Sequence, residues 1–320
     1  MTALPCTRYY QIAMTSKSYA FEPAYLHLAR SGELIHRVEQ AHTHLASCDL
    51  CAQECHVDRH TEKGVCRTGI PAVVSSHGPH HGEESPLSGW RGSGTIFFTW
   101  CNLKCQFCQN YEISQLGEGS QVEPEEIAAM MLDLQAMGCH NINFVSPSHV
   151  VAQILAAVAI AAQAGLRLPL VYNTGGYDSL AALKLLDGVV DIYMPDMKYA
   201  DARLALRLSK ARNYPEVNRV AVKEMHRQVG DLVLDERGIA QRGLLVRHLV
   251  LPGGLAGTRE VAHFLAEEIS HDTYINVMAQ YHPCYKALEH PPLDRRITSK
   301  EYAEAVATCR AARLHRFDQE

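Results

Sequence analysis

The sequence predicts an α/β fold in which the strands of a parallel sheet alternate with helices and form a partial or complete barrel. From about Ser93 onward, short β-rich runs alternate with longer helical patterns, which is typical of repeated βα units. At 320 residues the chain is long enough for one such domain, whose core alone can exceed about 200 residues, together with an appendage.

Six segments have the length and composition expected of the strands: Gly94–Trp100, Asn141–Val145, Leu168–Tyr172, Val189–Met194, Val246–Leu251 and Tyr274–Met278. Pro124 is expected at the first turn of a helix that carries an apolar stripe. The apolar run Val150–Leu166 is too short to span a membrane and predicts a core helix. Asp231–Gly243 predicts a hairpin, and Thr298–Leu314 predicts a final surface helix.

The first 90 residues differ from the rest in composition. They contain histidine and cysteine clusters, and only Pro23–Leu45 is clearly periodic, whereas Ser75–Gly94 is a connector rich in glycine, proline and histidine. We therefore expect an N-terminal helical and cysteine-rich appendage with a connector loop over residues 1–90. A core barrel is expected over residues 91–283, and a C-terminal tail and helix over residues 284–320.

Charge and composition exclude few classes of protein but favour some. The formal net charge of −5 offers no broad attraction to phosphate backbones, so nucleic-acid binding is unsupported. Met1–Ala13 has no basic stretch followed by an apolar run, and we expect a cytoplasmic protein without a membrane segment. The chain has 11 cysteines, and an odd number without a secretory signal favours metal binding or catalysis over disulfides.

Cys101, Cys105 and Cys108 lie within eight residues, directly after a predicted strand. A loop at the carboxyl end of a strand presents them together, and this is the end at which barrel active sites lie. A cubane cluster usually takes four thiolates, so three leave one iron open for a substrate or cofactor. The alternatives are a zinc knuckle or buried thiols, but no fourth ligand follows at a matching spacing before His140.

At these residues the sequence resembles the radical S-adenosylmethionine (SAM) superfamily. In particular, it resembles the group related to pyruvate formate-lyase activating enzymes, in the branch with an N-terminal cysteine segment. The similar runs are His80–Glu84, Ser88–Phe98, Cys101–Asn110, Phe144–His149, Val171–Tyr177, Asp191–Tyr199 and Ile275–Pro283. The resemblance implies a partial (β/α)6 radical SAM barrel.

The resemblance also implies the chemistry. A 4Fe-4S cluster on the three cysteines would reductively cleave SAM to methionine and a 5′-deoxyadenosyl radical, which abstracts hydrogen from a substrate. The electron would come from a donor such as flavodoxin or ferredoxin. The substrate is unknown, either a small molecule or a glycyl-radical enzyme that the protein activates. The alternative function is a zinc or iron-sulfur binding or electron-transfer module without SAM chemistry.

Several residues are expected to bind SAM. Phe107, just before the last thiolate, would pack on the adenine face. Ser146 and Ser148 lie where relatives often carry Gly-Gly-Glu to hold the amino group of SAM, so that contact falls to these serines or to backbone carbonyls. Trp100, where relatives commonly have a small residue, is a second departure and is expected at the rim of the pocket.

Further candidates lie at the ends of later strands. Asn173 matches a position that relatives use for the ribose or amino-acid end of SAM, or is a turn residue before two glycines. Asp196 and Lys198 are two residues apart and face the same side. Lys198 would bind the carboxylate of SAM, unless it forms a surface ion pair with Asp196. His282 matches a histidine near the adenosyl group.

Two other groups have the chemistry of metal ligands. His80, His81, Glu83 and Glu84 are the first, and a pocket-lining loop is preferred over a metal site. The second group spans nineteen residues and supplies four thiolates, from Cys48, Cys51, Cys55 and Cys66. Four thiolates close a tetrahedral zinc site or fill a second iron-sulfur cluster, and free thiols are a third possibility.

Overall fold

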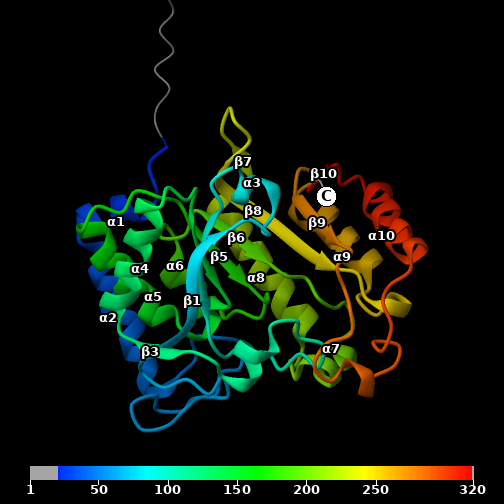
Figure 1. The fold of residues 1–320 in the computed structure, drawn as a ribbon, viewed down its shortest axis with the longest axis horizontal. Helices are drawn as coiled ribbons and strands as arrows, with labels where there is room; N and C mark the ends of the chain where they lie inside the picture. Colours follow the sequence, from blue (N-terminus) through cyan, green and yellow to red (C-terminus); the bar gives the residue numbers. More distant parts are fainter. Residues whose placement is uncertain (1–20, 319–320) are drawn as a thin grey trace, which may run out of the picture.

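The computed structural model describes residues 21–318 and has a ten-stranded sheet at its centre (Figure 1). Six neighbouring strands run parallel: β2 (Ser93–Phe98), β4 (Ile142–Val145), β5 (Leu170–Thr174), β6 (Ile192–Pro195), β8 (Ala240–Leu249) and β9 (Tyr274–Met278). They correspond to the six predicted strands. The sheet is open, because β10 (Arg316–Phe317) and β3 (Ser120–Val122) form its two edges. The predicted α/β fold with a partial barrel is confirmed.

The connector before the first parallel strand was predicted to be a loop, and this prediction is wrong. Its first part forms β1 (Ala72–His80), which pairs antiparallel with β2 and with the short strand β3. The composition concealed this strand because proline and glycine are unfavourable in strand interiors. Pro79 is tolerated because β3 pairs only with residues 72–74, so that at Pro79 the strand has its one partner on the β2 side.

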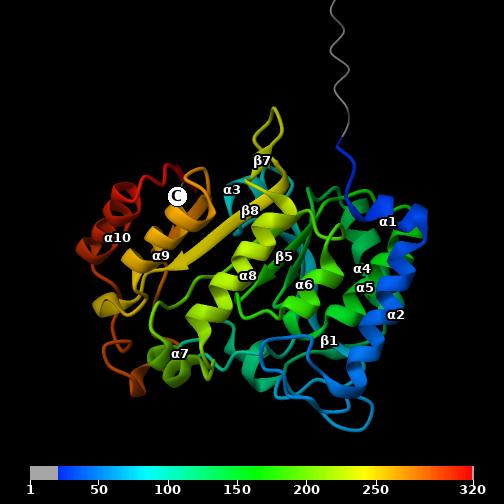
Figure 2. The same cartoon turned by 180° about the vertical axis from the view of Figure 1, so that it is seen from behind.

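Helices cover the outer face of the sheet (Figures 1 and 2). Their bounds are α1 (Tyr25–Ser31), α2 (Glu33–Thr43), α3 (Ser85–Ser88), α4 (Pro124–Ala136), α5 (Val151–Gln163), α6 (Leu180–Leu186), α7 (Ala202–Ser209), α8 (Tyr214–Val229), α9 (Thr258–Phe264) and α10 (Ser299–Ala311). The π-helical turns Glu112–Leu116 and Leu265–Ile269 and 3-10 turns at His44–Ser47, Pro147–His149, Pro252–Gly254 and Ala287–Glu289 complete the elements.

The sequence explains where the predicted helices begin and what they bury. Pro124 starts α4, and Glu123 and Glu126 form a capping box there. The predicted core helix is α5, which is buried on nearly all sides. The predicted hairpin is also present, since β7 (Val233–Leu234) pairs antiparallel with the start of β8. In the described part of the chain, no helix is long and apolar enough to cross a membrane. Met1–Ala13 lies outside the described residues.

The short helix α3 closes one end of the barrel. Leu87 is fully buried and packs with side chains that point inward from the strands, among them Val171, Met194 and Leu245. In both views α3 lies at the top, whereas α7 lies at the bottom, where the parallel strands end (Figures 1 and 2). The interior of the barrel is therefore closed beside α3 and can open only toward the carboxyl ends of the strands.

We predict that Leu87→Ala lowers the free energy of unfolding by about 2 to 5 kcal/mol, because it leaves a cavity in this plug. Leu288→Ala is the matched control: the Leu288 side chain is 72 % exposed, and we expect a change within about 0.5 kcal/mol. Denaturant titration of both variants measures the difference. Equal losses would contradict the packing of α3 inside the barrel.

Candidate active site

A cavity of about 380 Å³ lies at the carboxyl ends of the parallel strands. Its wall includes residues at the ends of five strands: Phe98, Val145, Asn173, Leu249 and Met278. Parallel strands bring their carboxyl ends to one edge, so side chains that are far apart in the sequence meet here. The cavity is thus the place where this fold can assemble chemistry.

The cysteine loop, residues Cys101–Cys108, follows β2 and contributes all three of its cysteines to the wall of this cavity. The end of α7 holds the loop in place. The backbone amide of Lys104 donates to the carbonyl of Ser209 over 2.8 Å, and the amide of Gln106 donates to the carbonyl of Leu208 over 2.7 Å. The three thiols are therefore presented by a loop whose backbone is fixed on both sides of Cys105.

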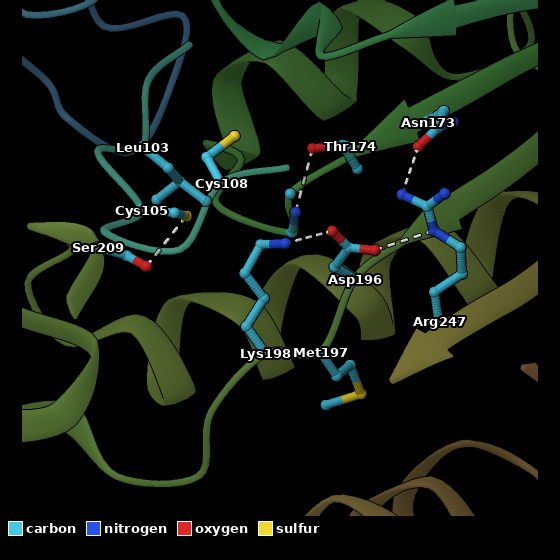
Figure 3. Close-up of polar contacts among 12 residues, drawn as sticks. Leu103, Cys105, Cys108, Asn173, Thr174, Asp196, Met197, Lys198, Ser209 and Arg247 are labelled. Carbon is cyan, nitrogen blue, oxygen red and sulfur yellow. Dashed lines mark hydrogen bonds and ion pairs between the residues drawn. The ribbon is translucent and has the colours of Figure 1, made fainter. Parts of the chain in front are cut away.

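Each of the three sulfur atoms has a polar hydrogen-bond partner. The amide of Leu103 donates to Cys101 Sγ over 3.4 Å, and Ser209 Oγ donates to Cys105 Sγ over 3.1 Å (Figure 3). Cys108 Sγ lies 3.1 Å from Ser114 Oγ. Donors of this kind stabilise thiolates and tune the reduction potential of an iron-sulfur cluster.

The donor set fits a cluster with three thiolate ligands. Burial, together with the neighbouring Cys105 and Cys108, raises the pKa of Cys101 to about 12, so the Cys101 thiol keeps its proton unless a metal binds it. Among the described residues, no three side chains converge as they would around a single metal ion. A cubane binds each thiolate through a different iron, so its ligands are spread more widely than those of one ion.

A buried ionic network crosses the cavity opposite the cysteine loop (Figure 3). Asp196 Oδ2 lies 2.5 Å from Lys198 Nζ, and Arg247 Nε donates to Asp196 Oδ1 over 2.9 Å. Arg247 Nη2 also donates to Asn173 Oδ1 over 2.7 Å. The side chains of Asp196 and Lys198 are only 11 % and 19 % exposed, so their ion pair lies inside the cavity and is not a surface pair.

The network keeps both members of the pair charged. Burial opposes the ionisation of Asp196, but Arg247 and Lys198 outweigh it and lower the pKa of this carboxyl. For Lys198, burial again opposes the charge, and Asp196 together with Cys105 outweighs it and raises the pKa. Lys198 lines the same cavity as the three cysteines of the loop.

The remaining SAM-binding candidates lie at different depths. Phe107 and Ser146 line the cavity, and the ring of Phe107 meets Tyr281 edge to face at a centroid distance of 6.0 Å. Ser148 is buried behind the wall, where its hydroxyl lies 2.9 Å from Thr174 Oγ1. His282 is at the rim, with Nδ1 3.3 Å from Gln109 Nε2, and Gln109 is itself a wall residue.

Sequence reasoning missed Arg247, which joins β8 to the ends of β5 and β6. The available signal was a charged residue inside the apolar run Leu244–Leu251, since an arginine in a buried strand needs a partner. Glu83 lines the cavity, as expected for a pocket-lining loop. Trp100 points away from the cavity, and its ring packs beneath the guanidinium of Arg67, whose Cζ lies 5.2 Å from the ring centroid.

The N-terminal thiol group, Cys48, Cys51, Cys55 and Cys66, gathers in one region, although no three of its sulfur atoms converge as the ligands of a single metal ion would. A Cβ atom placed on Gly64 would lie 3.3 Å from the sulfur atoms of both Cys55 and Cys66. Burial raises the pKa of Cys51, and the three other thiols raise it further. Arg59 Nη1 donates to Cys48 Sγ over 3.5 Å.

This thiol group also lies against the cysteine loop. Gln53 Nε2 donates to the carbonyl of Asn102 over 2.7 Å, and Arg67 Nη1 donates to the carbonyl of Gln115, a wall residue, over 2.9 Å. The N-terminal segment therefore supports the cysteine loop directly.

Comparisons with known proteins identify a matching family and a similar chain. A family model described as the radical SAM superfamily matches residues 95–253. The chain is similar to an uncharacterized protein of Methanocaldococcus jannaschii, MJ0674, with 33 % identity over 280 residues, which cover 84 % of this chain and 76 % of the relative.

Three solved structures are also similar. Streptococcus suis SuiB bound to S-adenosylmethionine has a TM-score of 0.47 and 13 % identity, over 69 % of this chain and 47 % of that one, so this chain spans about half the length of SuiB. A radical SAM methyltransferase from Sphaerobacter thermophilus has a TM-score of 0.47 and 13 % identity, over 71 % of this chain and 67 % of that one. Methylornithine synthase, PylB, has a TM-score of 0.45 and 16 % identity, over 68 % of this chain and 62 % of that one.

The match to the family model includes the cysteine loop and the strands that carry Asn173, Asp196 and Arg247. The alignment with the relative extends over most of both chains. The chain therefore belongs to the radical SAM superfamily, which implies a 4Fe-4S cluster and SAM as its cofactors.

Proposed function

We propose that this protein uses Cys101, Cys105 and Cys108 to hold a 4Fe-4S cluster that cleaves SAM. The observation that carries the proposal is the arrangement of three thiols, each with a polar partner, in the wall of a cavity that an ionic network crosses. When bound, the cluster supplies the electron that splits SAM into methionine and a 5′-deoxyadenosyl radical, which abstracts hydrogen from a substrate.

The side chains of the cavity would bind and orient SAM. Lys198 carries a buried positive charge that suits the carboxylate of the methionine part, and Asp196 holds this ammonium group in position. Phe107 offers an aromatic surface for the adenine. Ser146 adds a hydroxyl at the end of β4, where the amino group of SAM would need an acceptor.

The hydrogen donor is the open part of this proposal. The sequence resemblance to pyruvate formate-lyase activating enzymes supports a glycine residue of a partner enzyme, and a flavodoxin or ferredoxin would then supply the electron. The alternative, a metal-binding or electron-transfer module without SAM chemistry, is distinguished by direct binding: a reconstituted protein with full iron content that does not bind SAM would favour it.

We predict that Cys105→Ala abolishes the formation of 5′-deoxyadenosine and methionine, because two thiolates cannot hold the cluster. The measurement is product analysis of anaerobically reconstituted, reduced protein. Cys309→Ala is the control, since Cys309 is a buried thiol of α10 and should leave product formation intact. Unchanged activity in Cys105→Ala would defeat the assignment.

We also predict that Lys198→Met raises the dissociation constant of SAM about 10- to 100-fold, the effect of losing one charge-assisted hydrogen bond. Iron content should stay as in the wild type. The matched control is Lys223→Met, because Lys223 pairs with Glu268 on the surface. Equilibrium binding to the reconstituted proteins checks this, and equal affinities for both variants would remove Lys198 from the SAM site.

For the N-terminal thiol group we propose a second metal centre, zinc or a second iron-sulfur cluster. Four thiols close together, with the guanidinium of Arg59 beside Cys48, support it. We predict more metal than the four irons of one cluster in anaerobically purified protein, and loss of only this excess in Cys51→Ala. One zinc per chain identifies a zinc site and eight irons a cluster. Four irons without zinc in the wild type would show that these thiols are free.

A further inference from the structure

A polar layer that includes the ionic network crosses the interior of the barrel. We call it the lumen layer. Its members are Asn143, Asn173, Arg247 and Asn276 from four strands, Asp196 directly after β6, and Glu83 and Glu84 from the segment between β1 and α3. Asn143 belongs to the layer because it lies two residues before Val145, a wall residue, and so faces the same side of β4. Apolar side chains packed on Leu87 lie beneath it.

Glu83 is a member of this layer whose carboxyl group has no close cationic partner among the described residues. It lines the cavity, and its side chain is 8 % exposed. Its Oε1 lies 3.6 Å from His80 Nδ1 and its Oε2 lies 3.9 Å from Arg247 Nη1, both too long for hydrogen bonds. Glu84, by contrast, accepts a hydrogen bond from Asn276 Nδ2 over 3.0 Å. The Glu83 carboxyl is therefore near several polar groups and closely bound to neither of these two.

Several buried polar atoms around Glu83 have no hydrogen-bond partner among the described residues. They are both polar atoms of the Asn143 carboxamide, His80 Nδ1 and Glu84 Oε2. Asn143 is fully buried, and its carboxamide lies close enough to the Glu83 carboxyl to lower the pKa of Glu83, but neither of its polar atoms has a partner at hydrogen-bond distance and angle in the described part of the chain. Buried unpartnered groups are rare and cost free energy, so a cluster of them indicates a missing ligand or water.

The charges of the lumen layer indicate the sign of that ligand. Asp196 is paired with both Lys198 and Arg247. Arg247 is also the cationic neighbour of Glu83 and Glu84, but it lies farther from them than from Asp196. Burial raises the pKa of Glu83 to about 7; Arg247 opposes this rise and Glu84 adds to it. A buried carboxyl group in this situation either keeps a proton or gains a cationic partner.

We propose that Glu83, with Asn143 and His80, forms a substrate subsite that binds a protonated amine. The proposal rests on the function proposed above and names the class of its substrate: a molecule or peptide side chain that carries an ammonium group. Its ammonium would donate to the Glu83 carboxylate and to Asn143 Oδ1. The alkyl part would then extend up the cavity toward the cysteine loop, where the radical forms.

Position separates this subsite from the site of the SAM amino group. The segment that carries Glu83 lies beside α3, at the closed end of the barrel, whereas the cysteine loop rests on α7 at the opposite end (Figure 1). Both line one continuous cavity. A ligand bound at the closed end would leave room for SAM at the open end, and its carbon atoms would lie between the two.

The test uses cluster-reconstituted protein and n-butylammonium as the probe, with butan-1-ol as an uncharged probe of similar size. Ligand-observed NMR measures binding in the presence of saturating SAM. We expect n-butylammonium to bind more tightly than butan-1-ol, and Glu83→Gln to weaken its binding about 10- to 100-fold. Glu216→Gln, on the exposed face of α8, is the control and should bind the probe as the wild type does.

A second variant separates a binding role from a structural one. Asn143→Leu replaces an unpartnered carboxamide with an apolar group of similar size, so we expect an unchanged or higher unfolding midpoint together with weaker probe binding. A clear loss of stability with unchanged probe binding would make Asn143 a structural residue and overturn the proposal.

Other outcomes also decide the matter. If SAM displaces n-butylammonium, the ammonium site belongs to the cofactor and the substrate subsite is wrong. If n-butylammonium binds no better than butan-1-ol, or binds Glu83→Gln equally well, the subsite is wrong as well. Failure of the wild type to form 5′-deoxyadenosine is a separate result, which contradicts the proposed function and leaves the ammonium-binding measurement standing on its own.

Discussion

The cavity depends on the ion pairs that the buried carboxylate of Asp196 forms with Lys198 and Arg247. An unpaired charge inside a protein is strongly unfavourable, so Asp196 requires its two cationic partners. Removing one partner leaves a buried charge that is no longer fully compensated, which costs free energy. Through Arg247 it ties the end of β6 to β8, and Arg247 extends the connection to Asn173 on β5. The positions of three strand ends relative to the cysteine loop follow from this pairing.

The cysteine loop depends on contacts that come from far along the chain. Its backbone is bound to the end of α7, one of its sulfurs accepts a hydrogen bond from Ser209, and Gln53 from the N-terminal segment contacts Asn102. Such support matters because a metal site works only when its ligands are held in position by their surroundings. The N-terminal segment is thus part of the framework of the site, whatever its own thiols bind.

The two ends of the barrel have different chemistry. At the open end, sulfur, an ammonium group and aromatic rings surround the cavity. Toward the closed end, carboxyl and carboxamide groups lie above the apolar plug around Leu87. Buried polar groups without partners reduce stability, and proteins retain them where function requires them. A polar floor beneath a reactive centre is suited to orienting a substrate, since hydrogen abstraction depends on which carbon is held nearest the radical.

The sequence alone determined the parts of this protein that local patterns encode. Strand and helix periodicity predicted six parallel strands and the core helix, and the spacing of Cys101, Cys105 and Cys108 predicted a three-thiolate site after a strand. These features are local because a period of two or a spacing of three depends on neighbouring residues only. The connector strand β1 escaped prediction, because its proline and glycine are tolerated only through its position near the edge of the sheet.

Only the tertiary structure decided which distant side chains share the barrel interior. Arg247 meets Asp196 and Asn173 across three strands, and Glu83 reaches the same space from a segment that precedes the first parallel strand. Whether such groups pair, and which are left without a partner, depends on strand order, register and the tilt of the barrel. These are properties of long-range packing, which no local pattern in the sequence contains.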